Sequence, residues 1–299
     1  MQGKTRADRA GFAAAVMVGT DLTLSIADAI IKATLTSMPL SQFIFLRSCV
    51  TIPLLVLILR WRCPALSLKP VQPFWASLRS ALLLISLLLY YASLPRLDLS
   101  IAAAVYYTIP LFITLFSALL TGEAAGKAGW AGVGLGFAGV LLMLRPSPSD
   151  LNIHALMPLA SAILYAFAMI LTRTRARSEN PFILALIFNL LALILGGGAS
   201  LAASLSAITE TGIFMGPWLA MESWHWLLIL LLSGTMLIGS VGTAIAYQSG
   251  PPNIVATWDF SYLVFAVLWG VLIFSERLDL PELTGIALII LAGILVIRR

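Results

Sequence analysis

The sequence has 299 residues, of which 60% are hydrophobic and only 10% are charged, and its mean hydropathy is +1.00. A soluble globular protein carries about a quarter charged residues, so this composition excludes an ordinary soluble domain. The net charge of +5 is small and its basic residues lie at the ends of apolar segments, which argues against a nucleic-acid partner. The two cysteines provide no disulfide framework and no thiolate metal site. The sequence predicts an all-α membrane protein.

Ten segments are long and apolar enough to cross a membrane as helices. About 20 mostly apolar residues are required, because roughly 30 Å of hydrocarbon is crossed at 1.5 Å per residue. Lys and Arg are concentrated in alternate loops, so the positive-inside rule predicts a multi-pass protein of the inner (cytoplasmic) membrane with both termini in the cytoplasm. The predicted spans are roughly 11–31, 41–60, 72–94, 100–121, 127–145, 153–173, 181–205, 224–248, 253–275 and 282–298.

The first span carries Asp21, Asp28 and Lys32 at spacings that place them on one helical face. One interpretation is a polar stripe that lines a translocation path, because charged groups inside a bilayer are costly and mark functional sites. The other is a neutralised Asp28–Lys32 pair near the helix end, with Lys32 reaching the interface. The sequence favours the pair, and for Asp21 both interpretations stay open.

Arg47 lies inside the second span, and its role also has two interpretations. Its planar guanidinium suits a substrate carboxylate. Alternatively it pairs with Asp21 or Asp28 and holds the first two spans together, which the sequence favours.

Aromatic residues gather in the third, fourth and ninth spans, where we expect a cavity. An aromatic belt at the bilayer interface is the alternative. Asp259 in the ninth span is a candidate for binding an ammonium group or a proton, or else pairs with a nearby polar group. Pro110 interrupts the fourth span and is the expected hinge. The residues expected to line the cavity are Tyr90, Tyr91, Tyr106, Tyr107, Tyr165, Met169, Trp258 and Tyr262.

Spans 4–5 and 9–10 share a residue pattern. Ile101, Ala103, Glu123 and Gly132 recur at one constant offset as Ile254, Ala256, Glu276 and Gly285. Since five spans is an odd number, two such units insert with opposite orientation, a construction common in secondary transporters. We predict two inverted five-helix repeats, 1–149 and 150–299, within one membrane domain.

Ten spans, a five-plus-five repeat and a glutamate closing spans 4 and 9 resemble the drug/metabolite transporter superfamily. Within it the chain is similar to the EamA-type exporters, which include an aromatic amino-acid exporter branch. That family often has a proline in both spans 4 and 9; here Pro110 is present, but Leu263 stands at the matching position of the second. The resemblance implies export of small organic solutes and no bound cofactor.

The sequence therefore predicts a secondary transporter that exports small organic metabolites, most of all amino acids including aromatic ones, by alternating access. A Gly134-x-Gly136-x-x-Gly139 match to the dinucleotide fingerprint lies inside a span with no preceding strand. Without a nucleophile–base pair or a metal-ligand cluster, neither an enzyme nor a metal site is expected. A membrane-bound lipid- or drug-handling protein and a non-transporting sensor are the alternatives. The expected partners are the substrate and the bilayer, while proton coupling and oligomeric state stay open.

Overall fold

The structure, a computed structural model, describes residues 2–34, 38–62, 69–120, 127–144, 153–176, 178–206, 212, 214–249, 258 and 261–297. Within these ranges the chain is almost entirely helical and contains no strand. The helices are α1 (Gln2–Thr34), α2 (Leu40–Arg62), α3 (Pro73–Ser93), α4 (Leu99–Tyr106), α5 (Ile109–Leu120), α6 (Lys127–Leu144), α7 (Ile153–Thr174), α8 (Pro181–Leu205), α9 (Ser223–Ser249), α11 (Ser261–Phe274) and α12 (Leu280–Ile297).

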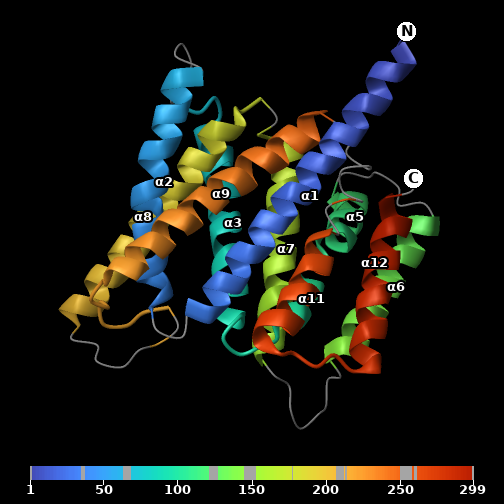
Figure 1. The fold of residues 1–299 in the computed structure, drawn as a ribbon. Coiled ribbons are helices and arrows are strands. Elements are labelled where there is room, and N and C mark those ends of the chain that lie inside the picture. The colour runs from blue at the N-terminus through green and yellow to red at the C-terminus, as the bar shows by residue number, and fades with distance from the viewer. Residues whose placement is uncertain are drawn as a thin grey trace.

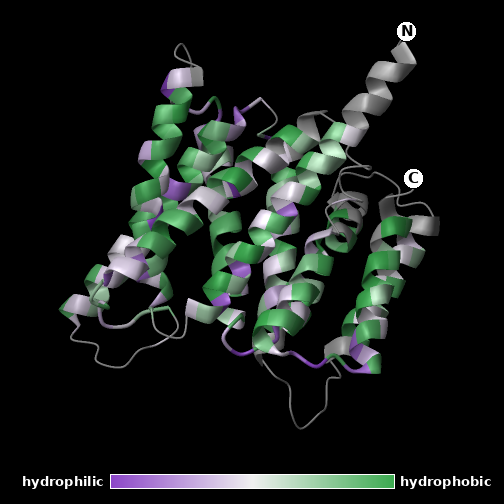
Figure 2. Ribbon diagram, in the orientation of Figure 1, coloured by the Kyte–Doolittle hydropathy of each residue, from purple (hydrophilic) through white to green (hydrophobic). Residues whose placement is uncertain are grey.

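Among the residues that Figure 2 colours, hydrophobic ones predominate along the helices. Among the described residues, five helical segments are long and apolar enough to cross a membrane: Gly11–Thr34, Leu40–Trp61, Pro73–Ser93, Pro181–Leu205 and Ser223–Thr243. Shorter apolar helical segments coincide with the other five predicted spans, at Leu99–Ile113, Trp130–Leu142, Leu156–Thr172, Ser261–Phe274 and Leu280–Ala292. The all-helical membrane fold is therefore as predicted, and the number of ten spans stays a prediction.

The predicted fourth span is not one continuous helix. It divides into α4 and α5 at Tyr107 and Thr108, where the Thr108 amide bonds to the Val105 carbonyl at 3.2 Å in a tighter turn. Pro110 is the second residue of α5, and because proline has no N–H it cannot continue the hydrogen-bond ladder of α4. The break is where the sequence predicted a bend.

Local sequence accounts for several helix boundaries. Pro181 is the first residue of α8, and the side chain of Asn180 accepts a hydrogen bond from the Phe182 amide at 2.9 Å. Ahead of α12, Asp279 and Glu282 exchange backbone-to-side-chain hydrogen bonds of 2.9 and 3.0 Å, a capping box. These caps satisfy amides that would otherwise have no partner at a helix start.

The helices form two groups with α1 and α7 between them (Figure 1). In one group α2 packs on α8 and on α9, and α3 packs on α8; in the other α6 packs on α12, and α4 packs on α11. Of the central helices, α1 contacts α9 and α11, and α7 contacts α3, α4 and α5. The start of α1 and the end of α12 lie at the same end of the bundle (Figure 1).

Small residues let helices approach closely at two of these contacts. A Cβ placed on Gly139 of α6 would lie 2.8 Å from the carbonyl oxygen of Gly285 in α12. A Cβ on Gly196 of α8 would lie 2.7 Å from the carbonyl oxygen of Ser41 in α2. Since backbone cannot yield as a side chain can, glycine is required for the observed spacing of both pairs, as is common where helices pack inside lipid.

Candidate functional site

Six of the seven tyrosines of the chain form one connected cluster in the middle of the bundle. The rings of Tyr107 and Tyr262 stack at 4.8 Å, and those of Tyr90 and Tyr106 lie 4.7 Å apart. Tyr165 of α7 extends the cluster through an edge contact with Tyr106 at 5.9 Å. The predicted association of tyrosines from the third, fourth, sixth and ninth spans is thus present.

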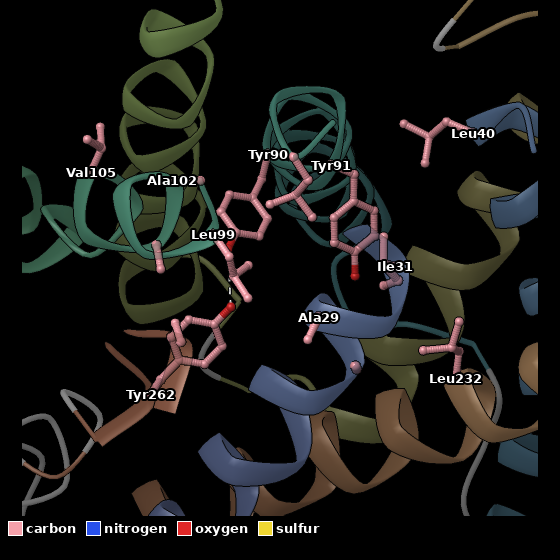
Figure 3. Close-up of a cluster of buried hydrophobic side chains, with 14 of the residues drawn as sticks. Ala29, Ile31, Leu40, Tyr90, Tyr91, Leu99, Ala102, Val105, Leu232 and Tyr262 are labelled. Carbon is pink, nitrogen blue, oxygen red and sulfur yellow. Dashed lines mark hydrogen bonds between the residues drawn. The ribbon is translucent and has the colours of Figure 1, made fainter. Parts of the chain in front are cut away.

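Hydrogen bonds tie this cluster to α1. The hydroxyls of Tyr90 and Tyr262 share a hydrogen bond of 3.1 Å, drawn as the dashed line in Figure 3, and the Tyr262 hydroxyl also lies in hydrogen-bonding contact with the Asp28 carboxylate. Tyr91 of α3 points toward α1 beside Ile31 (Figure 3) and interacts with Asp28 as well. Asp28 is half-buried and lines a small cavity, whereas these three tyrosines are buried.

Arg47 of α2 lies beside Asp28 and Tyr91. Its side chain is only 1% exposed, and it interacts with Tyr91 and, through its charge, with Asp28. The guanidinium carbon lies 5.5 Å from the centroid of the Phe43 ring. Its Nε and Nη2 atoms form no hydrogen bond with any described residue. Within the described part of the chain Arg47 forms no salt bridge with Asp28, so the pair that the sequence favoured stays a prediction, and two nitrogen atoms of the guanidinium have no acceptor there.

A small cavity of about 20 Å³ lies between these two charged groups. Asp28, Arg47 and Tyr91 supply its polar wall, and the rest comes from α1 and α9. About one water molecule fits a volume of this size, so a metabolite enters only if the surrounding helices move apart. Its other lining residues are Leu24, Ala27, Ile31, Leu232, Thr235 and Met236.

Lys32 is not paired with Asp28 as the sequence favoured. Its ammonium group forms a salt bridge of 3.3 Å with Glu276 and also donates to the Leu97 carbonyl. Glu276 further accepts hydrogen bonds from the Leu99 amide at 2.6 Å and from Ser100. Glu276 therefore caps the start of α4 from the end of α11, and this geometry draws Lys32 away from its neighbour on α1.

Asp21 lies about three turns before Lys32 on α1. It is fully buried, and it accepts a hydrogen bond of 2.7 Å from the Ser261 hydroxyl at the start of α11. Between the two aspartates, Ser25 accepts a hydrogen bond of 3.0 Å from the indole of Trp269. The polar face of α1 is thus packed against α11 along its length.

The remaining predicted site residues lie elsewhere. Trp258 keeps 49% of its surface exposed, so it lies on the surface rather than inside the tyrosine cluster. Met169 is half-buried one turn beyond Tyr165 on α7. Asp259 lies outside the described residues. The sequence did not single out Thr235 and Met236 as cavity residues, since neither belongs to a polar or aromatic pattern.

Residues 11–145 match the model of the EamA-like transporter family. The chain is also similar to the pseudopaline exporter of Pseudomonas aeruginosa, with 27% identity over 92% of each protein. It shares 28% identity with the riboflavin transporter of Rhizobium johnstonii, over 70% of this chain and 65% of the relative. The S-adenosylmethionine uptake transporter of Rickettsia prowazekii is 24% identical over 77% and 74% of the two chains.

One solved crystal structure superimposes with a TM-score of 0.66, covering 97% of both chains at 20% identity, and this likeness concerns the fold alone. The family match confirms the EamA resemblance seen in the sequence. Together with the transporter relatives it points to a multi-pass membrane transporter of small metabolites rather than an enzyme.

Proposed function

We propose that this protein is a secondary transporter that moves small organic metabolites across the inner membrane by alternating access, with amino acids including aromatic ones as the preferred class. The observation that carries the proposal is the polar cluster of Asp28, Arg47 and Tyr91, which lines one cavity inside a largely apolar bundle. Charged groups at such a depth are costly unless they face protein partners or a solvated path. The tyrosines beside them offer apolar area together with hydroxyl groups, which suits aromatic solutes.

The helix contacts support the proposed five-plus-five organisation. If α1, α2, α3, α4–α5 and α6 are exchanged with α7, α8, α9, α11 and α12, the most extensive contacts keep the same pattern. The α1–α9 contact then corresponds to the α7–α3 contact, and the α2–α9 contact corresponds to the α8–α3 contact. The α1–α11 contact corresponds to the contacts of α7 with α4 and α5. The α2–α8 and α6–α12 contacts are each unchanged by the exchange, because both partners swap places. Two units related in this way can adopt each other's conformation, which exposes a shared site to opposite sides in turn.

Transport is tested by counterflow in liposomes that contain the purified protein. Vesicles are loaded with one unlabelled compound from a panel of amino acids, flavins, nucleoside derivatives and amino-polycarboxylates, and the entry of the same labelled compound is followed. We expect accumulation of at least one panel member above that in protein-free vesicles. Lipid scrambling without counterflow, or ligand binding without any flux, would overturn the proposal in favour of a lipid-handling protein or a sensor.

A further inference from the structure

We infer that Arg47 and Asp28 form a clamp for a zwitterion, with Arg47 binding the carboxylate and Asp28 the ammonium group of an α-amino acid or a compound that carries one. This inference rests on the proposed function and names the chemistry of the group that its site recognises. The two residues come from α2 and α1, line one cavity, and both interact with Tyr91.

The unpaired atoms of Arg47 define the ligand chemistry. Nε and Nη2 carry the two N–H groups that point in parallel from one edge of the guanidinium, and both are buried without a hydrogen bond to the described residues. That edge matches the two oxygens of a carboxylate and binds them side by side. Since an arginine keeps its charge and a buried unpaired donor is costly, an edge left free inside the membrane is the mark of a ligand site rather than of a structural ion pair.

Asp28 is prepared for the opposite charge. The Tyr262 hydroxyl holds its carboxylate in place, and the salt bridge of Lys32 is made with Glu276, so the neighbouring cation on its own helix is engaged elsewhere. Asp28 is among the residues that line the cavity, whereas the fully buried Asp21 is not. A bound ammonium group would therefore meet a carboxylate held by Tyr262, in the cavity that Arg47 also lines.

The cavity also has a wall that can yield. Leu24 and Met236 lie on α1 and α9, and the thioether of a methionine is flexible enough to repack around different contents. Phe43 and the tyrosine cluster adjoin the charged groups, so an aromatic or aliphatic side chain attached to the zwitterion has apolar surface to occupy.

Binding of three related probes to the detergent-purified full chain tests the clamp: phenylalanine, phenethylamine, which lacks the carboxylate, and 3-phenylpropionate, which lacks the ammonium group. We expect wild-type protein to bind phenylalanine at least about tenfold more tightly than either analogue, since each loses one charge-assisted contact. Arg47→Gln is expected to weaken phenylalanine and phenylpropionate about tenfold while leaving phenethylamine unchanged. Asp28→Asn is expected to weaken phenylalanine and phenethylamine and to spare phenylpropionate.

Arg79→Gln is the matched control. Arg79 is another arginine within a membrane helix, but it lies about three turns from Tyr91 along α3, and its Nε donates to the Thr172 hydroxyl at 3.0 Å. This variant should bind all three probes as the wild type does. If Arg47→Gln does not fold, Arg47→Lys replaces it, because lysine keeps the charge but lacks the planar guanidinium. Arg47→Lys is expected to weaken only the binding of phenylalanine and 3-phenylpropionate, the two probes that carry a carboxylate.

Equal losses of all three probes in the Arg47 and Asp28 variants would overturn the clamp and leave a structural ion pair. Wild-type protein that binds none of the probes, or that transports only panel members lacking a carboxylate, overturns the clamp while transport itself stands. Selective probe binding without flux of any panel compound has the opposite meaning, because the clamp then stands and the transporter proposal fails.

Discussion

Replacing Gly270 by alanine should destabilise the protein through a contact that no local pattern reveals. A Cβ at this position of α11 would lie 2.2 Å from Oε2 of Glu276 and 2.9 Å from the Ser100 hydroxyl. The Glu276 carboxylate cannot simply rotate aside, because it holds the start of α4 and Lys32 by several hydrogen bonds. The added methyl group therefore displaces the carboxylate from at least one of these partners.

The size of the effect follows from two opposing contributions. Alanine in place of a helical glycine stabilises by roughly 0.5–1 kcal/mol. Loss of one hydrogen bond to a charged group costs about 1.5–3 kcal/mol. We therefore expect a net loss of about 0.5–2.5 kcal/mol, which lowers the unfolding temperature by a few degrees.

The matched control is Gly234→Ala in α9, where an added Cβ meets nothing within 4 Å. Thermal unfolding of both purified variants, followed by the fraction that stays monodisperse in detergent, should show Gly270→Ala below the wild type and Gly234→Ala at or above it. In a Glu276→Gln background the effect of Gly270→Ala should shrink, since the displaced group has already lost its charge. An unfolding temperature of Gly270→Ala equal to that of the control would refute this reasoning.

Three further experiments test the packing that positions the site. Gly139→Ala should lower the unfolding temperature more than Gly234→Ala does, because its Cβ would strike backbone of α12; an unchanged temperature would contradict the close approach. Gln42→Leu removes two hydrogen bonds to Leu219 and should make the segment before α9 more sensitive to limited proteolysis. A digestion pattern equal to that of the wild type would contradict this prediction. Ser86→Ala and Ser161→Ala each remove the hydrogen bond between the two hydroxyls of α3 and α7, so a double-mutant cycle should give a coupling of about 0.6 kcal/mol rather than zero.

Hydropathy alone was sufficient to locate the apolar helices, because lipid imposes the same requirement on every residue of a span. The break in the fourth span was equally predictable, since Pro110 lacks the N–H that a continuous helix needs. The association of the tyrosines was anticipated from their places within the spans, and the contacts of Tyr106 and Tyr165 agree with it.

The partner of Lys32 could not be predicted from local spacing. A separation of four residues made Asp28 the natural candidate, whereas Glu276 is 244 residues away in the chain. Only the fold brings the end of α11 to the start of α4, where the helix terminus adds a further attraction for the carboxylate. Trp258 was ambiguous for a different reason, since an aromatic residue near a span end fits a cavity and an interfacial belt equally well.

Alternating exposure of the cavity is measured most directly with a single cysteine at Thr235, a buried residue of its wall, in a variant in which Cys49 and Cys63 are replaced by serine. A membrane-impermeant thiol reagent is applied to oriented vesicles from one side or the other, with and without a transported compound. The account predicts labelling from both sides, and a change in the ratio of the two rates when the compound is present. Labelling from one side only, at a rate that the compound does not alter, would contradict it.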